Sequence, residues 1–497
     1  MLNSRMNGTG RSKLRARGLG KARPQPLEAS VRILGAPRPT PEQLRIVSDN
    51  QPGFMLIKGA AGSGKTTTAL LRLRQLCTMW LNRRERLGLT EPVRVLVLTF
   101  NTTLQGYITE LARQQVAGNT GLHLEVSTFG RWAMGLLGHP AVCDDNKSAE
   151  LLRPLLTGMP HGQDFLIDEI RYVLDRFPPD HIAEYLTTRR VGRGLVPRVE
   201  GSLRHQLITT ALAPYKAQKD ELGLLDWNDI AVAAGSVTDT PGWDVIIIDE
   251  AQDFSANQVR AVLNHLNEPG SLTFVMDAVQ RIYPRYFSWK EVGVTLEPTR
   301  IHTLKSNHRN TREIAAFARP LVIGLPPEDD GNLPDFDACA RSGPKPVVYV
   351  GRYGEQINAM LERLTLTVDF ASESVAFLKP MGGGWFDELK RRLRNAGIPF
   401  TELTRTSVWP SGPEAVALCT LHSAKGLEFD HVVLPGLSAR MTPHGQEPGD
   451  GQLDAHRRLV AMGVGRARKS VMLGYKPGEE STIVSLLDPS TYEQVTL

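Results

Sequence analysis

The sequence has few of the features that define secreted, membrane-spanning or zinc-binding proteins. Only four cysteines occur in 497 residues, at Cys77, Cys143, Cys339 and Cys419, and no two of them form a CxxC pair. This spacing argues against a zinc motif or a disulfide framework and favours a reducing compartment. No apolar run approaches the roughly 18 residues that a membrane-spanning helix needs. We therefore predict a cytoplasmic protein without a membrane partner.

Part of the excess positive charge is concentrated near the N-terminus. The formal net charge of +5 permits an anionic partner without requiring one. Residues 5–24, RMNGTGRSKLRARGLGKARP, contain seven Arg or Lys and no acid. We predict that residues 1–36 form a basic disordered tail, and the alternative is an arm that binds nucleic acid nonspecifically.

Buried-strand patterns alternate with helical patterns in two successive sets. The segments GFMLIKG, VRVLVLTF, DVIIIDE and LTFVMD are continuous apolar runs of the kind found in parallel strands. A later set contains KPVVYVG, SVAFLKP, VALCTLH, HVVLPG and SVMLGY, with helical stretches such as FDELKRRLRNAG between them. This alternation predicts two α/β domains with parallel sheets, at residues 37–294 and 295–497. The helical pattern of residues 140–225 predicts an insertion into the first domain.

A glycine-rich loop provides the first chemical signal. Residues 57–67 read IKGAAGSGKTT and match the pattern GxxxxGK[ST], after a predicted strand and at the start of a predicted helix. Backbone N–H groups and the helix N-terminus bind phosphate in this motif. Lys65 is expected to reach the β and γ phosphates of ATP, and Thr66 to bind Mg²⁺. The predicted nucleotide-binding residues of the loop are Gly59, Ala60, Ala61, Gly62, Ser63, Gly64, Lys65, Thr66 and Thr67.

An acidic pair provides the second signal. The segment VIIIDEAQD places Asp249 and Glu250 at the carboxyl end of a buried strand, where α/β sheets bind their ligands. We expect Asp249 to hold Mg²⁺ by way of water, and Glu250 to orient or deprotonate the attacking water. Together with the phosphate loop, the pair predicts ATP hydrolysis.

The order of these and later motifs resembles the superfamily 1 helicases of the UvrD/Rep/PcrA type. DEAQD resembles motif II, TPEQLRIV the Q motif, VLTFNTTL motif Ia, STFGRWA motif Ib and MDAVQRIY motif III. LKSNHRNTREI, CTLHSAKGLEFDHVVL and RRLVAMGVGRARKSVML resemble motifs IV, V and VI. The resemblance spans roughly residues 38–475 and implies two RecA-like P-loop NTPase domains.

The resemblance also implies roles for residues outside the phosphate loop. Gln43 would contact adenine, and Gln280 would sense the γ-phosphate. Arg309 would contact the γ-phosphate and Arg466 would be the arginine finger, both on the second domain. Glu428 would complete the nucleotide-binding residues. The implied DNA-binding positions are Thr99, Phe100, Thr128, Phe129, Tyr283, Tyr286, Thr420 and His422.

The chain departs from the family pattern in three places. Gly465 stands where motif VI usually has Thr, and Ala461 where it usually has Tyr. After motif III four aromatic residues are alternatives for the one that stacks on a base: Tyr283, Tyr286, Phe287 and Trp289. About 110 residues separate Arg309 from Thr420, which leaves no room for the intact second-domain insertion called 2B.

The sequence therefore predicts an ATP-dependent DNA helicase or translocase that uses Mg²⁺ and acts on single-stranded or partly duplex DNA. Movement from 3′ to 5′ is implied by the resemblance alone. The alternative is a nucleic-acid-sensing ATPase subunit that switches a partner, such as a nuclease or another effector, without efficient unwinding. An RNA substrate is a further alternative, and the helicase interpretation is compatible with a role in DNA repair or in phage defence.

Overall fold

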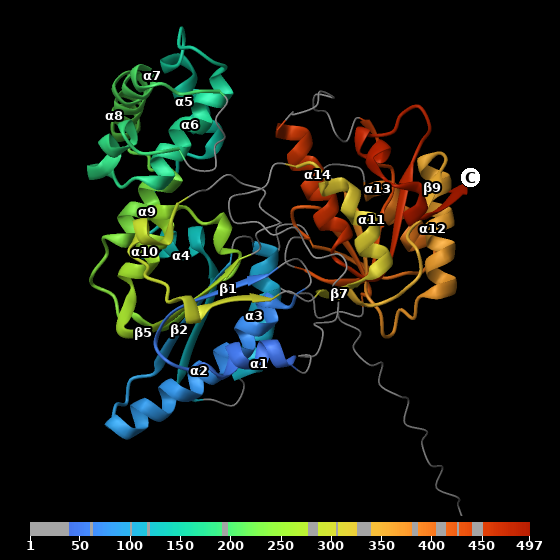
Figure 1. Ribbon diagram of the computed structural model, residues 1–497, viewed down its shortest axis with the longest axis horizontal. Helices are drawn as coiled ribbons and strands as arrows, with labels where there is room; N and C mark the ends of the chain where they lie inside the picture. Colours follow the sequence, from blue (N-terminus) through green and yellow to red (C-terminus); the bar gives the residue numbers. More distant parts are fainter. Residues whose placement is uncertain are drawn as a thin grey trace, which may run out of the picture.

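The computed structural model contains two α/β bodies, each built on a parallel sheet (Figure 1). It describes residues 39–59, 63–99, 102–116, 120–190, 197–276, 287–304, 307–325, 339–379, 386–403, 414–424, 427–439 and 451–497. The predicted basic tail lies outside the described residues, as do the predicted site residues Ala60, Ala61, Gly62, Phe100, Gln280, Tyr283 and Tyr286.

Six parallel strands form the first sheet, in the order β3-β2-β4-β5-β1-β6. Their bounds are β1 Gly53–Gly59, β2 Val93–Thr99, β3 Leu122–Thr128, β4 Trp243–Ile248, β5 Leu266–Met276 and β6 Ile301–Leu304. Because the strands are parallel, the predicted site residues at the ends of β1, β2, β3 and β4 all lie along one edge of the sheet.

Helices cover both faces of the first sheet, as expected for strands that are apolar on both sides. Side chains of α1 (Pro41–Ser48), α2 (Lys65–Leu87) and α3 (Thr102–Val116) share one core with Val95, Val97 and Ile247. Those of α4 (Phe129–Leu136), α9 (Trp227–Gly235) and α10 (Ala256–Asn264) share another with Ile246 and Ile248. Short helical turns are η3 Ala251–Asp253, η4 Trp289–Val292 and η5 Pro298–Arg300.

A separate group of helices follows α4 and has its own apolar core. It comprises α5 Asp145–Leu155, α6 Gln163–Arg176, η1 Pro179–Leu186, α7 Gly201–Gln206, the π-helix η2 Leu207–Leu212 and α8 Ala213–Leu222. Asn257 ties the group to helix α10, since its Nδ2 donates to the carbonyls of Leu174 (2.8 Å) and Phe177 (3.0 Å). These helices occupy the region that was predicted as an insertion.

The second sheet has seven parallel strands in the order β11-β12-β10-β13-β14-β9-β15. The bounds are β9 Val347–Val350, β10 Val375–Lys379, β11 Phe400–Glu402, β12 Val416–Thr420, β13 Phe429–Leu434, β14 Ala467–Tyr475 and β15 Glu493–Thr496. Two further strands, β7 Asn307–Thr311 and β8 Cys339–Arg341, pair with each other.

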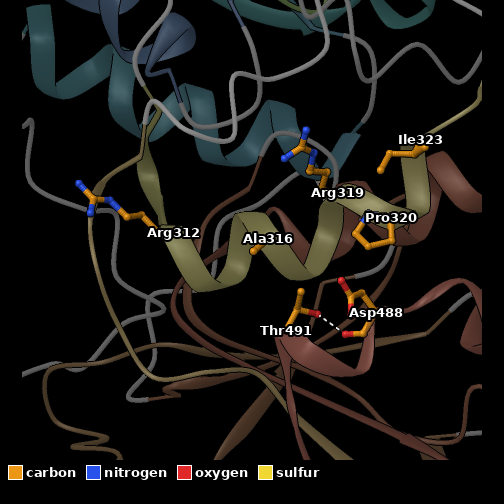
Figure 2. Close-up of a pocket in the computed structure, with 7 residues that line it drawn as sticks. All are labelled: Arg312, Ala316, Arg319, Pro320, Ile323, Asp488 and Thr491. Atoms are coloured by element: carbon orange, nitrogen blue, oxygen red, sulfur yellow. Dashed lines mark hydrogen bonds between the residues drawn. The ribbon is translucent and has the colours of Figure 1, made fainter.

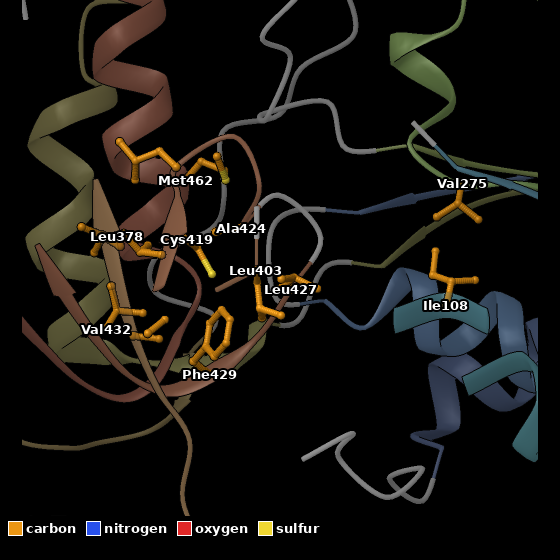
Figure 3. Close-up of a cluster of buried hydrophobic side chains, with 14 of the residues drawn as sticks. Ile108, Val275, Leu378, Leu403, Cys419, Ala424, Leu427, Phe429, Val432 and Met462 are labelled. Carbon is orange, nitrogen blue, oxygen red and sulfur yellow. The ribbon is translucent and has the colours of Figure 1, made fainter. Parts of the chain in front are cut away.

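Helices again cover both faces of this second sheet. One face packs against α11 (Arg312–Val322) and α14 (Gly451–Val464), and the other against α12 (Tyr353–Thr367) and α13 (Phe386–Asn395). The remaining turns are η8 Thr482–Leu486 and η9 Pro489–Thr491. Figure 3 shows Cys419 and Phe429 of the second sheet with Met462 of α14, and Ile108 of α3 beside Val275 of β5.

The observed sheets confirm the predicted α/β class with two parallel sheets. One strand extends the first sheet past the predicted domain boundary at residue 294, because β6 pairs with β1 from Leu56↔Ile301 to Gly59↔Leu304. The sequence IHTL lacks a continuous apolar run, and only Leu304 in it is buried. Among the described residues, no helix combines the length and apolarity needed to cross a bilayer.

Candidate functional site

The phosphate loop lies between the end of β1 and the start of α2, and its described residues before the helix are Gly59, Ser63 and Gly64. Gly64 precedes the helix with a φ of 77°, a left-handed conformation that glycine adopts without strain. A Cβ at Gly59 would lie 2.2 Å from Ser63 Oγ, so a side chain at this position would require Ser63 to move. Lys65 and Thr66 are the first two residues of α2, and the N-terminus of this helix faces the loop.

The start of α1 packs against this loop. Thr40 and Gln43 form a capping box, in which Gln43 Oε1 accepts from Thr40 N at 2.9 Å. The amide of Gln43 also donates to the Ser63 carbonyl at 3.5 Å. The structure thus brings the predicted adenine-contacting residue against the phosphate loop.

The acidic pair at the end of β4 faces the start of α2. Thr66 Oγ1 lies 3.2 Å from each carboxylate oxygen of Asp249. Burial and the neighbouring charge of Glu250 raise the pKa of Asp249 to about 7, whereas Lys65 and the Thr66 hydroxyl act in the opposite direction. A hydroxyl and a carboxylate on adjacent elements are the hard oxygen donors that suit Mg²⁺ next to phosphates.

Glu250 has an unusual backbone conformation. Its φ of 53° is left-handed, which is uncommon for a residue with a side chain and concentrates at functional sites. The side chain is buried, and Gln252 Nε2 donates to it. Glu250 is thus fixed next to Asp249 at the carboxyl end of the strand.

The two predicted arginines lie together in the second α/β body. Arg309 on β7 forms an ion pair with Glu428 and donates to the Gly465 carbonyl at 3.4 Å. Burial favours the neutral form of Glu428, but the charges of Arg309, Arg468 and Arg466 outweigh it and lower the pKa of Glu428. Arg466 is only 1% exposed, and its Nε contacts Met462 Sδ at 3.3 Å.

The predicted DNA-binding residues have different surroundings. Thr99 and Thr128 are paired in register at the ends of β2 and β3, and Thr99 is buried. Phe129 packs in the core, 5% exposed, so its ring is not presented to a base in this conformation. On the second body, Thr420 Oγ1 donates to Ser423 Oγ at 2.9 Å, and His422 is exposed.

One further aromatic residue lies near the carboxyl end of β3, in the first body. Trp227, the first residue of α9, is 41% exposed. Its ring lies against Gly130 of α4, where an added Cβ would be 3.3 Å away. Trp227 is not among the residues that the sequence motifs predict to bind DNA. Its local pattern, an aromatic residue directly after a helix-capping side chain, is shared with the buried Phe129 and therefore does not predict its exposure.

A cavity of about 610 Å³ lies elsewhere on the second body (Figure 2). It is lined by Arg312, Ala316, Arg319, Pro320, Ile323, Asp488 and Thr491. These residues come from α11 and the loop that follows it, and from the region of η9, and they include none of the predicted nucleotide or DNA residues. The described residues contain no cluster of three His, Cys, Asp or Glu side chains that could hold a metal by themselves.

The fold and the loop geometry define an α/β protein of the P-loop nucleotide-binding class. The sequence matches two protein-family models. The model of the UvrD/REP helicase N-terminal domain covers residues 40–289, and that of the UvrD-like helicase C-terminal domain covers residues 386–477. The chain therefore belongs to the UvrD-like helicase family. This confirms the resemblance that the motifs suggested.

Individual relatives align over short segments. DNA helicase II of Haemophilus influenzae is 33% identical over 131 residues, which cover 26% of this chain and 17% of that protein. DNA helicase II of Escherichia coli is 44% identical over 63 residues, 12% of this chain and 9% of the relative. The helicase PcrA of Bacillus subtilis is 40% identical over 63 residues, 12% and 8% of the two chains. The matched segments span less than a fifth of these relatives.

Proposed function

We propose that the chain is an ATP-dependent DNA translocase or helicase that moves from 3′ to 5′ on single-stranded DNA. The observation that carries the proposal is the contact of Thr66 with Asp249 at the phosphate loop, in a chain of the UvrD-like family. The relatives named above are DNA helicases by description, which favours DNA over RNA as the nucleic acid.

The first α/β body supplies the groups that bind and activate the triphosphate. Lys65 and the N-terminus of α2 bind phosphate oxygens. Thr66 and Asp249 would hold Mg²⁺, which neutralises phosphate charge when bound. Gln252 fixes Glu250, which orients the attacking water and accepts its proton.

The second body supplies positive charge for the transferring phosphoryl group. Arg309 and Arg466 stabilise the charge that develops on its oxygens, and such an arginine contributes about 10³–10⁵ in rate. Because these arginines and the phosphate loop belong to different bodies, hydrolysis changes how strongly the two bodies are held together. If each body also holds the strand, through Thr99 and Thr128 on one and Thr420 and His422 on the other, closing and opening moves the protein along it.

One structural observation favours the alternative of a partner-switching ATPase. The described residues between Arg309 and Thr420 form only strands and helices of the second body and the β7–β8 pair. These described residues contain no additional domain of the kind called 2B. Such a chain suits work beside a nuclease or another effector, in DNA repair or phage defence, with unwinding as a secondary activity.

The test compares ATP hydrolysis and strand displacement by the purified chain. We expect single-stranded DNA to stimulate hydrolysis, and added salt to weaken the stimulation, because phosphate contacts release counterions. Lys65→Ala should abolish hydrolysis, whereas Leu87→Ala, at an exposed position at the other end of α2, should leave it unchanged. Near-normal turnover of Lys65→Ala rejects the proposal.

Duplexes with a 3′ or a 5′ single-stranded tail separate the two candidate functions. Displacement of only the 3′-tailed duplex supports the helicase and its polarity. Stimulated hydrolysis without displacement of either duplex supports the partner-switching ATPase. Stimulation by RNA but not by DNA changes the substrate class.

A further inference from the structure

Asn310 lies next to Arg309 on β7 and connects this strand to the turn that carries Arg466. Its side chain is 4% exposed. The Nδ2 atom donates to the Gly465 carbonyl at 3.1 Å and to the Ala467 carbonyl at 2.7 Å. These are the carbonyls on either side of Arg466, so one amide group holds the backbone of that residue from both sides.

Other hydrogen bonds also hold this turn, among them Gly465 N to the Ala461 carbonyl at 2.9 Å and Arg309 Nη1 to the Gly465 carbonyl at 3.4 Å. The turn joins α14 to β14 through Gly465, which has no side chain to bond with its surroundings and is the most flexible residue type. The backbone of Arg466 itself is held by two bonds, from its N–H to Gly463 O at 3.1 Å and from Phe429 N to its carbonyl at 3.0 Å. The Asn310 amide bonds to both neighbours of Arg466, whereas the Arg309 guanidinium bonds to the Gly465 carbonyl on one side.

We propose that Asn310 is a positioning residue for Arg466. It holds the 465–467 turn so that the guanidinium group of Arg466 is oriented before ATP arrives. This inference rests on the proposed ATP hydrolysis. Oriented charges stabilise a transition state without rearranging during the reaction, and a displacement of about 1 Å can cost on the order of 10²-fold in rate. Position 465 is a glycine without a side chain, so Asn310 supplies a side-chain restraint from β7 instead.

The chain offers a matched control for the test. Asn257 is also buried, 2% exposed, and its Nδ2 also donates to two backbone carbonyls, those of Leu174 and Phe177. It anchors the inserted helices to α10 of the first body, whereas Arg309 and Arg466 belong to the second body. Asn310→Ala and Asn257→Ala therefore remove the same kind of contact from different places.

The experiment measures steady-state hydrolysis for Asn310→Ala, Arg466→Ala, the double variant and Asn257→Ala. We expect Asn310→Ala to lower kcat about 10- to 100-fold with little change in KM for ATP. Asn257→Ala should leave kcat near that of the wild type. The double variant should be no slower than Arg466→Ala, because Asn310 acts through Arg466 and the two effects are then not additive.

Amide hydrogen exchange of the nucleotide-free protein gives a second readout that does not depend on activity. Peptides containing Gly465–Ala467 should exchange faster in Asn310→Ala and unchanged in Asn257→Ala. If the alanine variant does not fold, Asn310→Ser retains one short donor and should give intermediate exchange and an intermediate kcat.

Two results would overturn the inference. The first is a double variant slower than Arg466→Ala by the full factor of Asn310→Ala. The second is an Asn310→Ala variant with normal kcat and normal exchange. A wild-type chain without any ATP hydrolysis refutes the proposed function instead, and the exchange measurement still decides whether Asn310 holds the turn.

Discussion

The ion pair between Arg309 and Glu428 predicts a variant that distinguishes ATP from ADP. In the structure Glu428 neutralises Arg309, and the two side chains are 22% and 8% exposed. If Arg309 contacts the γ-phosphate, a nucleotide with three phosphates replaces or shares this carboxylate partner. Glu428→Gln keeps the size of the side chain and removes its charge. We expect Arg309 in this variant to gain more from a γ-phosphate than it does in the wild type.

The structure sets the size of the effect. Removing one partner of a fully buried ion pair costs about 3–5 kcal/mol, and a hydrogen bond to a charged group contributes about 1.5–3 kcal/mol. Because Glu428 is partly exposed, we expect Glu428→Gln to lose about 2 kcal/mol of stability without nucleotide. A γ-phosphate can recover at most this amount, which corresponds to about 30-fold in affinity.

The assay is the ratio of the dissociation constants for ADP and a slowly hydrolysed ATP analogue, measured for wild type and Glu428→Gln by titration calorimetry. The ratio should rise several-fold in the variant. An equal loss of affinity for both nucleotides would instead support the predicted direct contact of Glu428 with the nucleotide. An unchanged ratio with unchanged affinities would refute the role of Arg309 at the γ-phosphate.

Three further predictions address other parts of the molecule. Arg466→Ala should reduce turnover far more than ATP binding, and equal loss of both contradicts the assignment of Arg466 as an arginine finger. His422→Ala should keep basal hydrolysis and weaken its stimulation by oligonucleotides. Trp227→Ala should weaken binding of single-stranded DNA by about 1–3 kcal/mol if a base stacks on the ring, and Trp227→Phe should restore part of it; normal affinity of the alanine variant in an anisotropy titration excludes the contact. Burial lowers the pKa of His431 below 6.5, although Glu373 acts in the opposite direction, so the unfolded chain binds the proton more readily and the free energy of unfolding should fall as pH drops from 7.5 to 5.5. Urea titrations at the two pH values should show a smaller fall for His431→Asn, and an equal fall would assign the dependence to other groups.

The parts of the site that the sequence predicted are those determined by neighbours along the chain. A strand, a glycine loop and a helix start follow one another from Gly53 to Thr66, so their relative positions are fixed locally. The contact between Thr66 and Asp249 could also be inferred, because parallel strands present their carboxyl ends at one edge. The tether from Asn310 to the carbonyls of Gly465 and Ala467 could not, since nothing in either segment indicates a buried amide meeting two distant backbone groups.

Phe129 and Trp227 show why exposure cannot be read from such local patterns. Each is the first residue of a helix and directly follows a capping side chain, that of Thr128 or Asp226. Yet Phe129 is 5% exposed and Trp227 is 41% exposed. The centroids of the Phe129 and Phe254 rings are 6.0 Å apart, in the core that α10 shares with β4.

The ring of Trp227 instead lies against Gly130, whose missing side chain allows close contact without covering the rest of the indole. The difference is produced by what each helix packs against, and two nearly identical local signals therefore lead to a core residue and a surface residue. Base stacking requires an accessible ring face. For this reason Trp227 is the better candidate for a DNA contact at this edge, and Phe129→Ala would report mainly on the packing of α4.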